Sequence, residues 1–368
     1  MRPAQVLLPC VLLALACSAA AAPDEELLGK SAGYPIGTLA NWFFDERVRV
    51  GSFSNLDQIL PHYTLAKAAT PLPIPEAASA PKIEYSFENR TLALDDFLSH
   101  QRVTGFLLIK DGKLLAERYQ YDRNSGNRFI SHSMAKSIVS IAIGMALAEK
   151  KIGSLDDTVS KYVPQLAGNP YGETAIRNLL RMSSGVPFSE DYDGKDDLTR
   201  FVIARRESGS IEALRLFTTR ETEQGARFHY ASSETVVLTV LLRAVTGTTL
   251  SDYLTPRLWQ PIGAEADASW ARATDGTVPD WEVSMRPCAI TDVSECCWPM
   301  TAWLAASRSC RGTICSMRPT GAGNRKGSRR EGLHHISAMA TSSGCFQARS
   351  ADSRCSASTV SRSLSIPN

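Results

Sequence analysis

The clearest pattern of apolar and polar positions lies between residues 104 and 121. The segment TGFLLIKDGKLLAERYQY contains two apolar runs on either side of Asp111 and Gly112. An Asp-Gly pair between two such runs is a strong signal for a β-hairpin, because both residues tolerate the positive φ that a tight turn requires. The sequence therefore predicts two antiparallel strands joined by a short turn.

Helical spacing follows this hairpin. Apolar residues recur at intervals of three and four between Ser133 and Lys150, and Gly153 supplies a stop signal. Similar spacing predicts further helices over residues 174–182, 210–217, 235–244 and 252–258, with Gly247 as a stop before the last. These helices would form a mainly helical insert.

Composition is that of an ordinary globular protein. Hydrophobic residues make up 43% of the 368 positions and charged residues 21%, which suits one large domain or two. The formal net charge of +2 gives no reason to expect a nucleic-acid partner.

The first residues have the layout of a secretory signal. Arg2 precedes an apolar run from Val6 to Ala16, and an alanine-rich end follows. The run is too short to span a bilayer. We therefore expect residues 1–22 to be removed by cleavage between Ser18 and Ala22, and the mature chain to be periplasmic or secreted. The residues just before Cys17 also resemble a lipoprotein signal, which leaves open a lipid anchor through Cys17.

The tetrapeptide S-x-x-K occurs twice. The copy from Ser79 to Lys82 lies in a proline-rich stretch, so residues 23–84 read as an N-terminal extension and linker in which no helix fixes serine and lysine. The copy from Ser133 to Lys136 starts the first predicted helix, which places both side chains on one face, one turn apart. Free N–H groups and partial positive charge at a helix N-terminus favour a reactive serine there. We take this pair as a candidate nucleophile and base.

A tyrosine supplies a third candidate. The segment ARFHYASSETV places Tyr230 two residues before Ser232. Lysine accepts a proton only where its surroundings lower its pKa from about 10.4, and a phenol is a suitable group to relay that proton to a leaving group. A packed aromatic side chain is the other interpretation of Tyr230. Its order and spacing relative to the S-x-x-K motif favour the catalytic one.

Four segments together resemble the serine hydrolases of the β-lactamase and penicillin-binding group: SMAK (133–136), IRNLLRMSSGV (176–186), EDYDG (190–194) and FHYASSETVVLTVLL (228–242). Within that group, residues 85–275 are most similar to the 6-aminohexanoate-dimer hydrolases, which are related to class C β-lactamases. The resemblance implies that Ser133 is the acyl-forming nucleophile, Lys136 its base and Tyr230 the proton carrier. It also implies that Tyr192 and Ser232 bind substrate, although many relatives have asparagine in place of Ser232.

The resemblance also implies a mixed α/β (α+β), β-lactamase/transpeptidase-like fold over residues 85–280, with an antiparallel sheet flanked by helices and a helical domain inserted. It implies neither a cofactor nor a metal. The tetrahedral oxyanion would be held by the Ser133 N–H and by a second N–H from a late strand carrying a Lys-Thr-Gly or related motif. No such strand is recognisable in the sequence, so we expect the final strands to be missing.

The composition of the chain changes near residue 280. Residues 281–368 contain 11 Lys and Arg against 5 Asp and Glu, and seven of the nine cysteines. Reading from the third base of each codon permits family-like strings from Met285, Met339 and Arg354. We infer that translation leaves the family frame between about Asp275 and Trp281, so that residues 281–368 form an out-of-frame, poorly ordered tail. Disulfide bonds are the other explanation for cysteines in an exported chain.

Several other groups have simpler explanations than catalysis. The segment from Gly29 to Gly33 matches a nucleophile elbow but follows no predicted strand. Cys310, Cys315, His334 and His335 have no standard zinc spacing. We expect structural roles for His132 and His229, and a solvated loop for Glu190, Asp191 and Asp193.

Two classes of function remain open. The first is an exported serine hydrolase that cleaves a small amide or ester through an acyl-serine, as the 6-aminohexanoate-dimer hydrolases do, with β-lactamase, D-Ala-D-Ala carboxypeptidase and esterase activities as alternatives. The second is a truncated, non-catalytic relative that keeps its serine, lysine and tyrosine but cannot close its site. Likeness of fold cannot choose the substrate.

Overall fold

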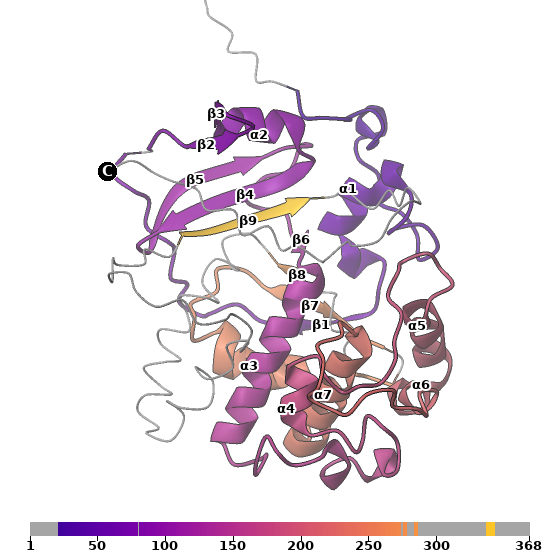
Figure 1. The fold of residues 1–368 in the computed structure, drawn as a ribbon. Coiled ribbons are helices and arrows are strands. Elements are labelled where there is room, and N and C mark those ends of the chain that lie inside the picture. Colours follow the sequence, from indigo (N-terminus) through magenta and orange to yellow (C-terminus); the bar gives the residue numbers. More distant parts are fainter. Residues whose placement is uncertain (1–20, 80, 274, 278–282, 286–335, 343–368) are drawn as a thin grey trace, which may run out of the picture.

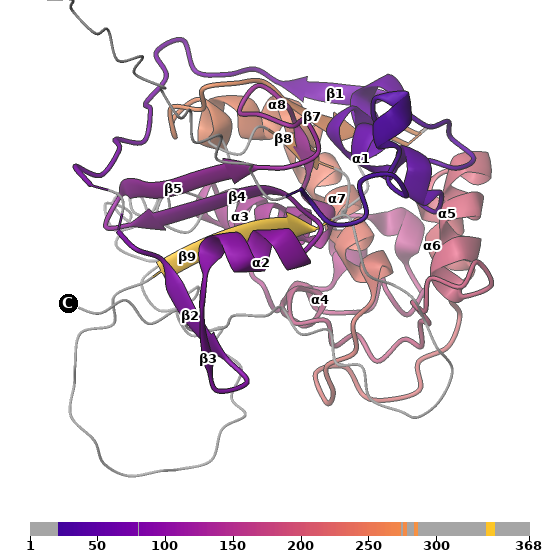
Figure 2. The same ribbon diagram turned by 90° about the horizontal axis from the view of Figure 1, so that it is seen from above.

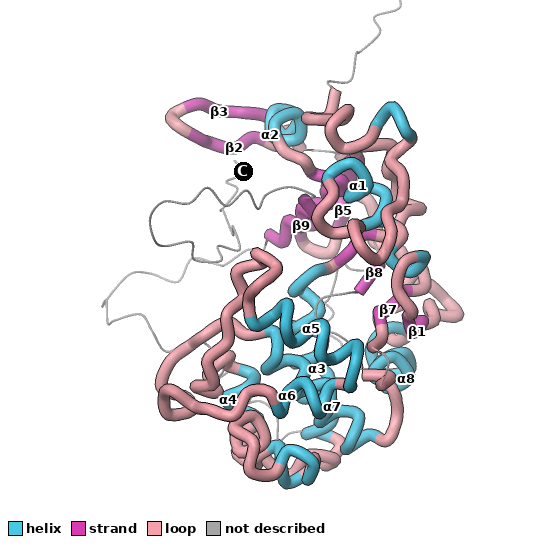
Figure 3. Tube along the Cα trace, turned by 90° about the vertical axis from the view of Figure 1, so that its right-hand side faces the viewer, coloured by secondary structure: helices cyan, strands magenta, loops and turns pink. Residues whose placement is uncertain are grey.

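The structure is a computed structural model of the chain. It describes residues 21–79, 81–273, 275–277, 283–285 and 336–342. Within these residues the protein is an α/β fold in which strands gather at one end and most helices at the other (Figures 1 and 3).

The strands form two sheets and a separate hairpin, and every ladder is antiparallel. A four-stranded sheet has the order β1-β7-β8-β6, a three-stranded sheet the order β5-β4-β9, and β2 pairs with β3. The strands are β1 (His62–Leu65), β2 (Glu84–Phe87), β3 (Arg90–Ala93), β4 (Val103–Lys110), β5 (Lys113–Tyr119), β6 (Phe129–Ile130), β7 (Ala268–Ala271), β8 (Val283–Met285) and β9 (Ile336–Ser342).

Eight α-helices are described: α1 (Glu46–Ser54), α2 (Leu94–His100), α3 (Ala135–Ala148), α4 (Ile176–Leu180), α5 (Asp197–Ser208), α6 (Ser210–Arg215), α7 (Ser232–Thr246) and α8 (Leu250–Leu254). Short 3-10 turns connect several of them, and a π-helical turn, Thr255–Trp259, follows α8.

The predicted hairpin is confirmed as β4 and β5. Asp111 and Gly112 form its turn with φ values of 51° and 69°, the left-handed conformation that favours this residue pair. On one face of β4, Phe106 and Leu108 pack with Leu94 and Leu98 of α2. The helices α3 to α7 lie on the other side of this sheet from α2 (Figures 1 and 3).

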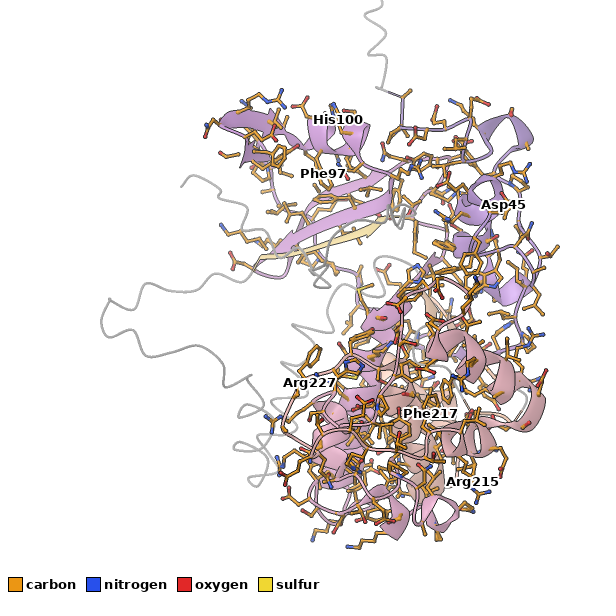
Figure 4. The ribbon with its side chains drawn as sticks, turned by 45° about the vertical axis from the view of Figure 1, so that its right-hand side comes forward. Asp45, Phe97, His100, Arg215, Phe217 and Arg227 are labelled. Atoms are coloured by element: carbon orange, nitrogen blue, oxygen red, sulfur yellow. The ribbon has the colours of Figure 1, made fainter. Side chains whose placement is uncertain are left out.

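The main hydrophobic core lies among the helices. Residues Ser232 to Leu242, the first three turns of α7, are buried on all sides, which makes this helix the centre of the helical half. Helix α3 packs against it and contributes Ile138, Ala142 and Ile143, among others, to the same core. Phe217 belongs to the same core, whereas Phe97 covers the β4–β5 sheet (Figure 4).

The remaining predicted helices are all present, with shifted ends. Helix α7 is longer than the 235–244 segment, and α4 is shorter than 174–182. The sequence did not predict α5. The buried face of α5 includes Arg205, whose guanidinium donates to Ser210 Oγ and Thr277 Oγ1. Because a charged residue is buried there, the sequence of this helix has no continuous apolar stripe.

Residues 23–84, expected to be an extension and linker, also form regular secondary structure. They contribute α1 and also β1, which pairs with β7 from His62↔Ala271 to Leu65↔Ala268 (Figure 2). The second S-x-x-K copy is non-helical at its described residues, as predicted. Gly29 to Gly33 form a 3-10 turn, and residues 21–28, the described part of the chain before it, contain no strand.

Two segments differ from the expectation of a tail without closing strands. Strand β8 pairs with both β6 and β7, and β9 pairs with β4 from Val103↔Ser342 to Lys110↔Ile336. The free edge of β4 needs backbone partners, and main-chain pairing makes few demands on side chains. The rest of the 281–368 segment lies outside the described residues, as do residues 1–20 of the signal expected over residues 1–22, including Cys17. The shift of frame stays a prediction. In the part of the chain that the structure describes, no helix is long and apolar enough to cross a membrane.

Candidate active site

The chain makes a sharp turn just before Ser133. Strand β6 ends at Ile130, a 3-10 turn covers His132–Met134, and α3 begins at Ala135. His132 adopts a φ of 46°, in the left-handed region that non-glycine residues occupy at some cost. The predicted helix therefore starts two residues after Ser133, and the serine precedes the first α-helical turn.

The three predicted catalytic side chains meet at one oxygen atom. Lys136 Nζ donates to Ser133 Oγ at 3.2 Å, and Tyr230 Oη lies 2.7 Å from the same Oγ. Lys136 Nζ also lies 5.2 Å from the centroid of the Tyr230 ring, within the range of a cation–π contact. A serine hydroxyl with an amine and a phenol at hydrogen-bonding distance can lose its proton to one of them and attack an electrophile.

Tyr230 lies between two residues that are held by hydrogen bonds, His229 and Ser232. It lies one residue before the N-cap Ala231 and two before Ser232, the first residue of α7. Its other neighbour, His229, donates its backbone N–H to Met182 O at 2.7 Å and places its ring Nε2 2.7 Å from Phe188 O. The expected structural role of His229 fits this geometry. Arg227, on the segment leading to Tyr230, lies at the surface (Figure 4).

The two predicted substrate-binding residues, Tyr192 and Ser232, share one partner, Glu190. The carboxylate Oε1 accepts from Tyr192 Oη at 2.6 Å and from Ser232 Oγ at 2.9 Å, and Oε2 accepts from the Ser232 N–H at 3.0 Å. Ser232 is only 1% exposed, so in this structure its hydroxyl serves Glu190. The sequence suggested a solvated loop for Glu190, whereas its carboxylate is half-buried and bonded; Asp191 and Asp193 are exposed as expected.

A second carboxylate fixes the backbone at Tyr192. Asp196 Oδ2 accepts the N–H groups of Asp191 and Tyr192, both at 2.7 Å, and its Oδ1 caps α5 through Thr199. Burial raises the pKa of Asp196, but these hydrogen bonds outweigh burial and hold it below its usual range. The carboxylate therefore stays ionised and keeps Tyr192 at a φ of 59°.

His132 faces an aromatic cluster of the N-terminal segment. Its ring packs edge-on against Phe53 and Phe43, with centroids 5.0 and 6.2 Å apart. Burial, aided by the charges of Lys136 and Arg49, lowers the pKa of His132 to about 4. The ring is therefore neutral at neutral pH, in keeping with the structural role expected for it.

Glu234 is a buried acid in the first turn of α7. Its Oε1 accepts from the N–H and hydroxyl of Ser184, at 3.1 and 2.6 Å, while the buried Oε2 has no hydrogen-bond partner among the described residues. Burial raises the pKa of Glu234 to about 7, despite the opposing effects of Ser184 and Arg220. This group joins the SSGV segment to α7.

A family model described as Beta-lactamase matches residues 93–291, more than half of the chain, and spans Ser133, Lys136 and Tyr230. The chain belongs to the β-lactamase family. The resemblance predicted from four short segments is thus confirmed for this β-lactamase-family domain, as is its mixed α/β fold.

Two curated relatives are similar to this β-lactamase-family chain. The 6-aminohexanoate-dimer hydrolase of Paenarthrobacter ureafaciens is 26% identical over 249 residues, which cover 66% of this chain and 61% of the relative. A protein of Escherichia coli K12 named "Putative D-alanyl-D-alanine carboxypeptidase" is 23% identical over 188 residues, covering 49% of this chain and 42% of that protein. The matched part of this chain thus spans about three fifths of the length of the first relative and less than half of the second.

A solved structure shows the same fold. The structure titled "Putative 6-aminohexanoate-dimer hydrolase from Bacillus anthracis" superimposes with a TM-score of 0.60 at 18% sequence identity, and the match covers 67% of each chain. At this identity the likeness concerns the fold alone.

Among the described residues, no group of three or more histidine, cysteine, aspartate or glutamate side chains could hold a metal ion. Cys310, Cys315, His334 and His335 lie outside these residues. Any late strand between β8 and β9 that could carry the second oxyanion donor would also lie outside them.

Proposed function

We propose that this β-lactamase-family chain is an exported serine hydrolase that cleaves a small amide or ester through an acyl-serine. The observation that carries the proposal is the meeting of Lys136 Nζ and Tyr230 Oη at Ser133 Oγ. An amine and a phenol at one hydroxyl provide a route for a proton from the nucleophile to the leaving group.

In the first half of the reaction, Ser133 Oγ attacks the carbonyl carbon and its proton passes to the neutral amine of Lys136. The carbonyl electron pair moves onto oxygen, where the Ser133 N–H and a second donor hold the negative charge. The intermediate collapses, the bond to the leaving group breaks, and Tyr230 Oη gives that group a proton. Lys136 then returns its proton to Tyr230, which leaves the acyl-serine.

In the second half, a water molecule replaces the leaving group. It gives a proton to the Tyr230–Lys136 pair as it attacks the acyl carbon, and Ser133 recovers its proton when the ester bond breaks. No cofactor is needed for either half, and the partner is the small-molecule substrate alone. Substrate contacts by Tyr192 and Ser232 remain part of the proposal.

The substrate proposed first is a short linear amide, as the name of the Paenarthrobacter relative suggests. Alternatives are a β-lactam, a D-alanyl-D-alanine peptide and a simple ester. Export follows from the signal-like residues 1–22, with the lipid anchor at Cys17 as a second form of the exported chain.

Labelling with a fluorophosphonate tests the proposed chemistry. The reagent should add to Ser133, as shown by peptide mass spectrometry, and a panel of 6-aminohexanoate dimer, nitrocefin, D-alanyl-D-alanine peptide and p-nitrophenyl butyrate should identify the class cleaved. Labelling at a different residue, or none at a concentration that labels a known serine hydrolase, would contradict the proposal.

The non-catalytic alternative is favoured by two features of the sequence. No Lys-Thr-Gly motif follows residue 280, and the composition changes there. Such a chain would bind substrate without turnover, so binding of the dimer without release of product is the result that would identify it.

A further inference from the structure

Glu190 accepts three hydrogen bonds from two elements of the site. One carboxylate oxygen is shared by the Tyr192 phenol and the Ser232 hydroxyl, and the other binds the Ser232 N–H. Glu190 lies on the loop before α5, 42 positions before Ser232 at the start of α7. The carboxylate therefore connects the Tyr192 loop to a helix end.

The contact with Ser232 supplies the cap that α7 lacks from its own sequence. Ala231, at the N-cap position, has no side-chain oxygen to accept a hydrogen bond from the first turn. Glu190 Oε2 accepts the first helical N–H instead, and its negative charge lies at the positive end of a fifteen-residue helix. The position where α7 begins thus depends on Glu190.

Tyr230 lies between this cap and the His229 anchor. His229 is bound to Met182 O and Phe188 O, and Ser232 is bound to Glu190, so the two residues that flank Tyr230–Ala231 are both held. Ala231 itself is fully buried. With both ends fixed, the phenol has little freedom, and its Oη lies 2.7 Å from Ser133 Oγ.

We propose that Glu190 is the positioning residue for Tyr230, and that through its shared oxygen it also couples the Tyr192 side chain to that position. The inference rests on the proposed function, in which Tyr230 protonates the leaving group. Glu190 does not touch the reacting atoms, so its loss should affect only the step that depends on the exact place of the phenol.

Substrates that differ in their need for a proton separate this effect from general damage. The p-nitrophenolate of p-nitrophenyl butyrate leaves without a proton, whereas the alkoxide of ethyl butyrate needs one. Glu190→Gln keeps size but replaces one acceptor oxygen by an NH₂ donor that faces other donors. We expect kcat/KM to fall about 10- to 100-fold for ethyl butyrate and less than about threefold for p-nitrophenyl butyrate.

Asp191→Asn is the matched control, because it removes an exposed charge from the same loop, and it should leave both rates unchanged. In a Tyr230→Phe background, Glu190→Gln should have no further effect on the ratio of the two rates. Equal loss for both esters, no loss, or full additivity with Tyr230→Phe would overturn the inference. Ser232→Ala, which removes one of the three hydrogen bonds, gives a second variant and should shift the ratio in the same direction. If the wild-type protein is not acylated at Ser133, the proposed function fails first, and the inference fails with it.

Discussion

Tyr230 Oη lies 2.7 Å from Ser133 Oγ, although 97 positions separate the two residues. The contact exists because α3 and α7 pack together, with Ser133 just before the first and Tyr230 just before the second. Lys136 joins them from the first turn of α3. The geometry of the site therefore depends on the packing of two helix beginnings.

Lys136→Arg should abolish acylation of Ser133 at neutral pH. A guanidinium stays protonated at any working pH, so it cannot accept the serine proton even though it keeps the positive charge. The measurement is the rate of release of p-nitrophenolate from p-nitrophenyl butyrate. Lys151→Arg, at an exposed position just after the same helix, should react like the wild type. Acylation by Lys136→Arg at the wild-type rate would exclude lysine as the base.

Tyr230→Phe should lower kcat/KM for ethyl butyrate by about 10²- to 10⁴-fold, because the leaving alkoxide loses its proton donor. The ring, and with it the packing, remains. Tyr85→Phe in the separate β2–β3 hairpin, where the Tyr85 ring packs against Phe97, serves as the control. An unchanged rate for Tyr230→Phe would assign the residue to packing alone.

Glu234 should make folding depend on pH. Because burial raises its pKa from 4.5 to about 7, the folded state favours the protonated acid. That contribution, about 3 kcal/mol at most, is fully present below pH 4.5 and is lost as pH rises through about 7. Glu234→Gln should therefore gain stability relative to the wild type at pH 8.5 compared with pH 5, as measured by urea denaturation. Exposed Glu221→Gln is the control, and an equal difference at both pH values would contradict the assignment.

The sequence predicted those parts of the site and of the fold that depend on local spacing. Ser133 and Lys136 are one turn apart, and the β4–β5 hairpin has an Asp-Gly turn, so both were visible as short patterns. The role of Glu190 was not visible in this way, because it depends on hydrogen bonds from Ser232, which lies on another element. No local pattern shows that a loop carboxylate will cap a helix 42 residues later.

The N-terminal segment was underestimated for a related reason. Its strand β1 has four residues, and it becomes a strand only by pairing with β7, about 200 residues away in sequence. Proline-rich composition nearby suggested a linker. Tertiary pairing overrides such local signals.

Restoring the family frame tests the account of residues 281–368. A gene with one base inserted or removed between codons 275 and 281 should give a protein that is more soluble and more active on the same ester. Size-exclusion chromatography and kcat/KM of both versions make the comparison. A stop codon within a few codons of the new frame, or a restored protein no better than the present one, would leave disulfide pairing as the explanation for the cysteines.

The most direct measurement is the detection of the acyl-enzyme itself. The protein is mixed with p-nitrophenyl butyrate, quenched with acid within the burst phase, and analysed by intact-protein and peptide mass spectrometry. The account predicts one added butyryl group on the peptide that contains Ser133, and none in Ser133→Ala, which should also lose all turnover. A butyryl group on another residue, or turnover in Ser133→Ala within two- or threefold of the wild type, would contradict it.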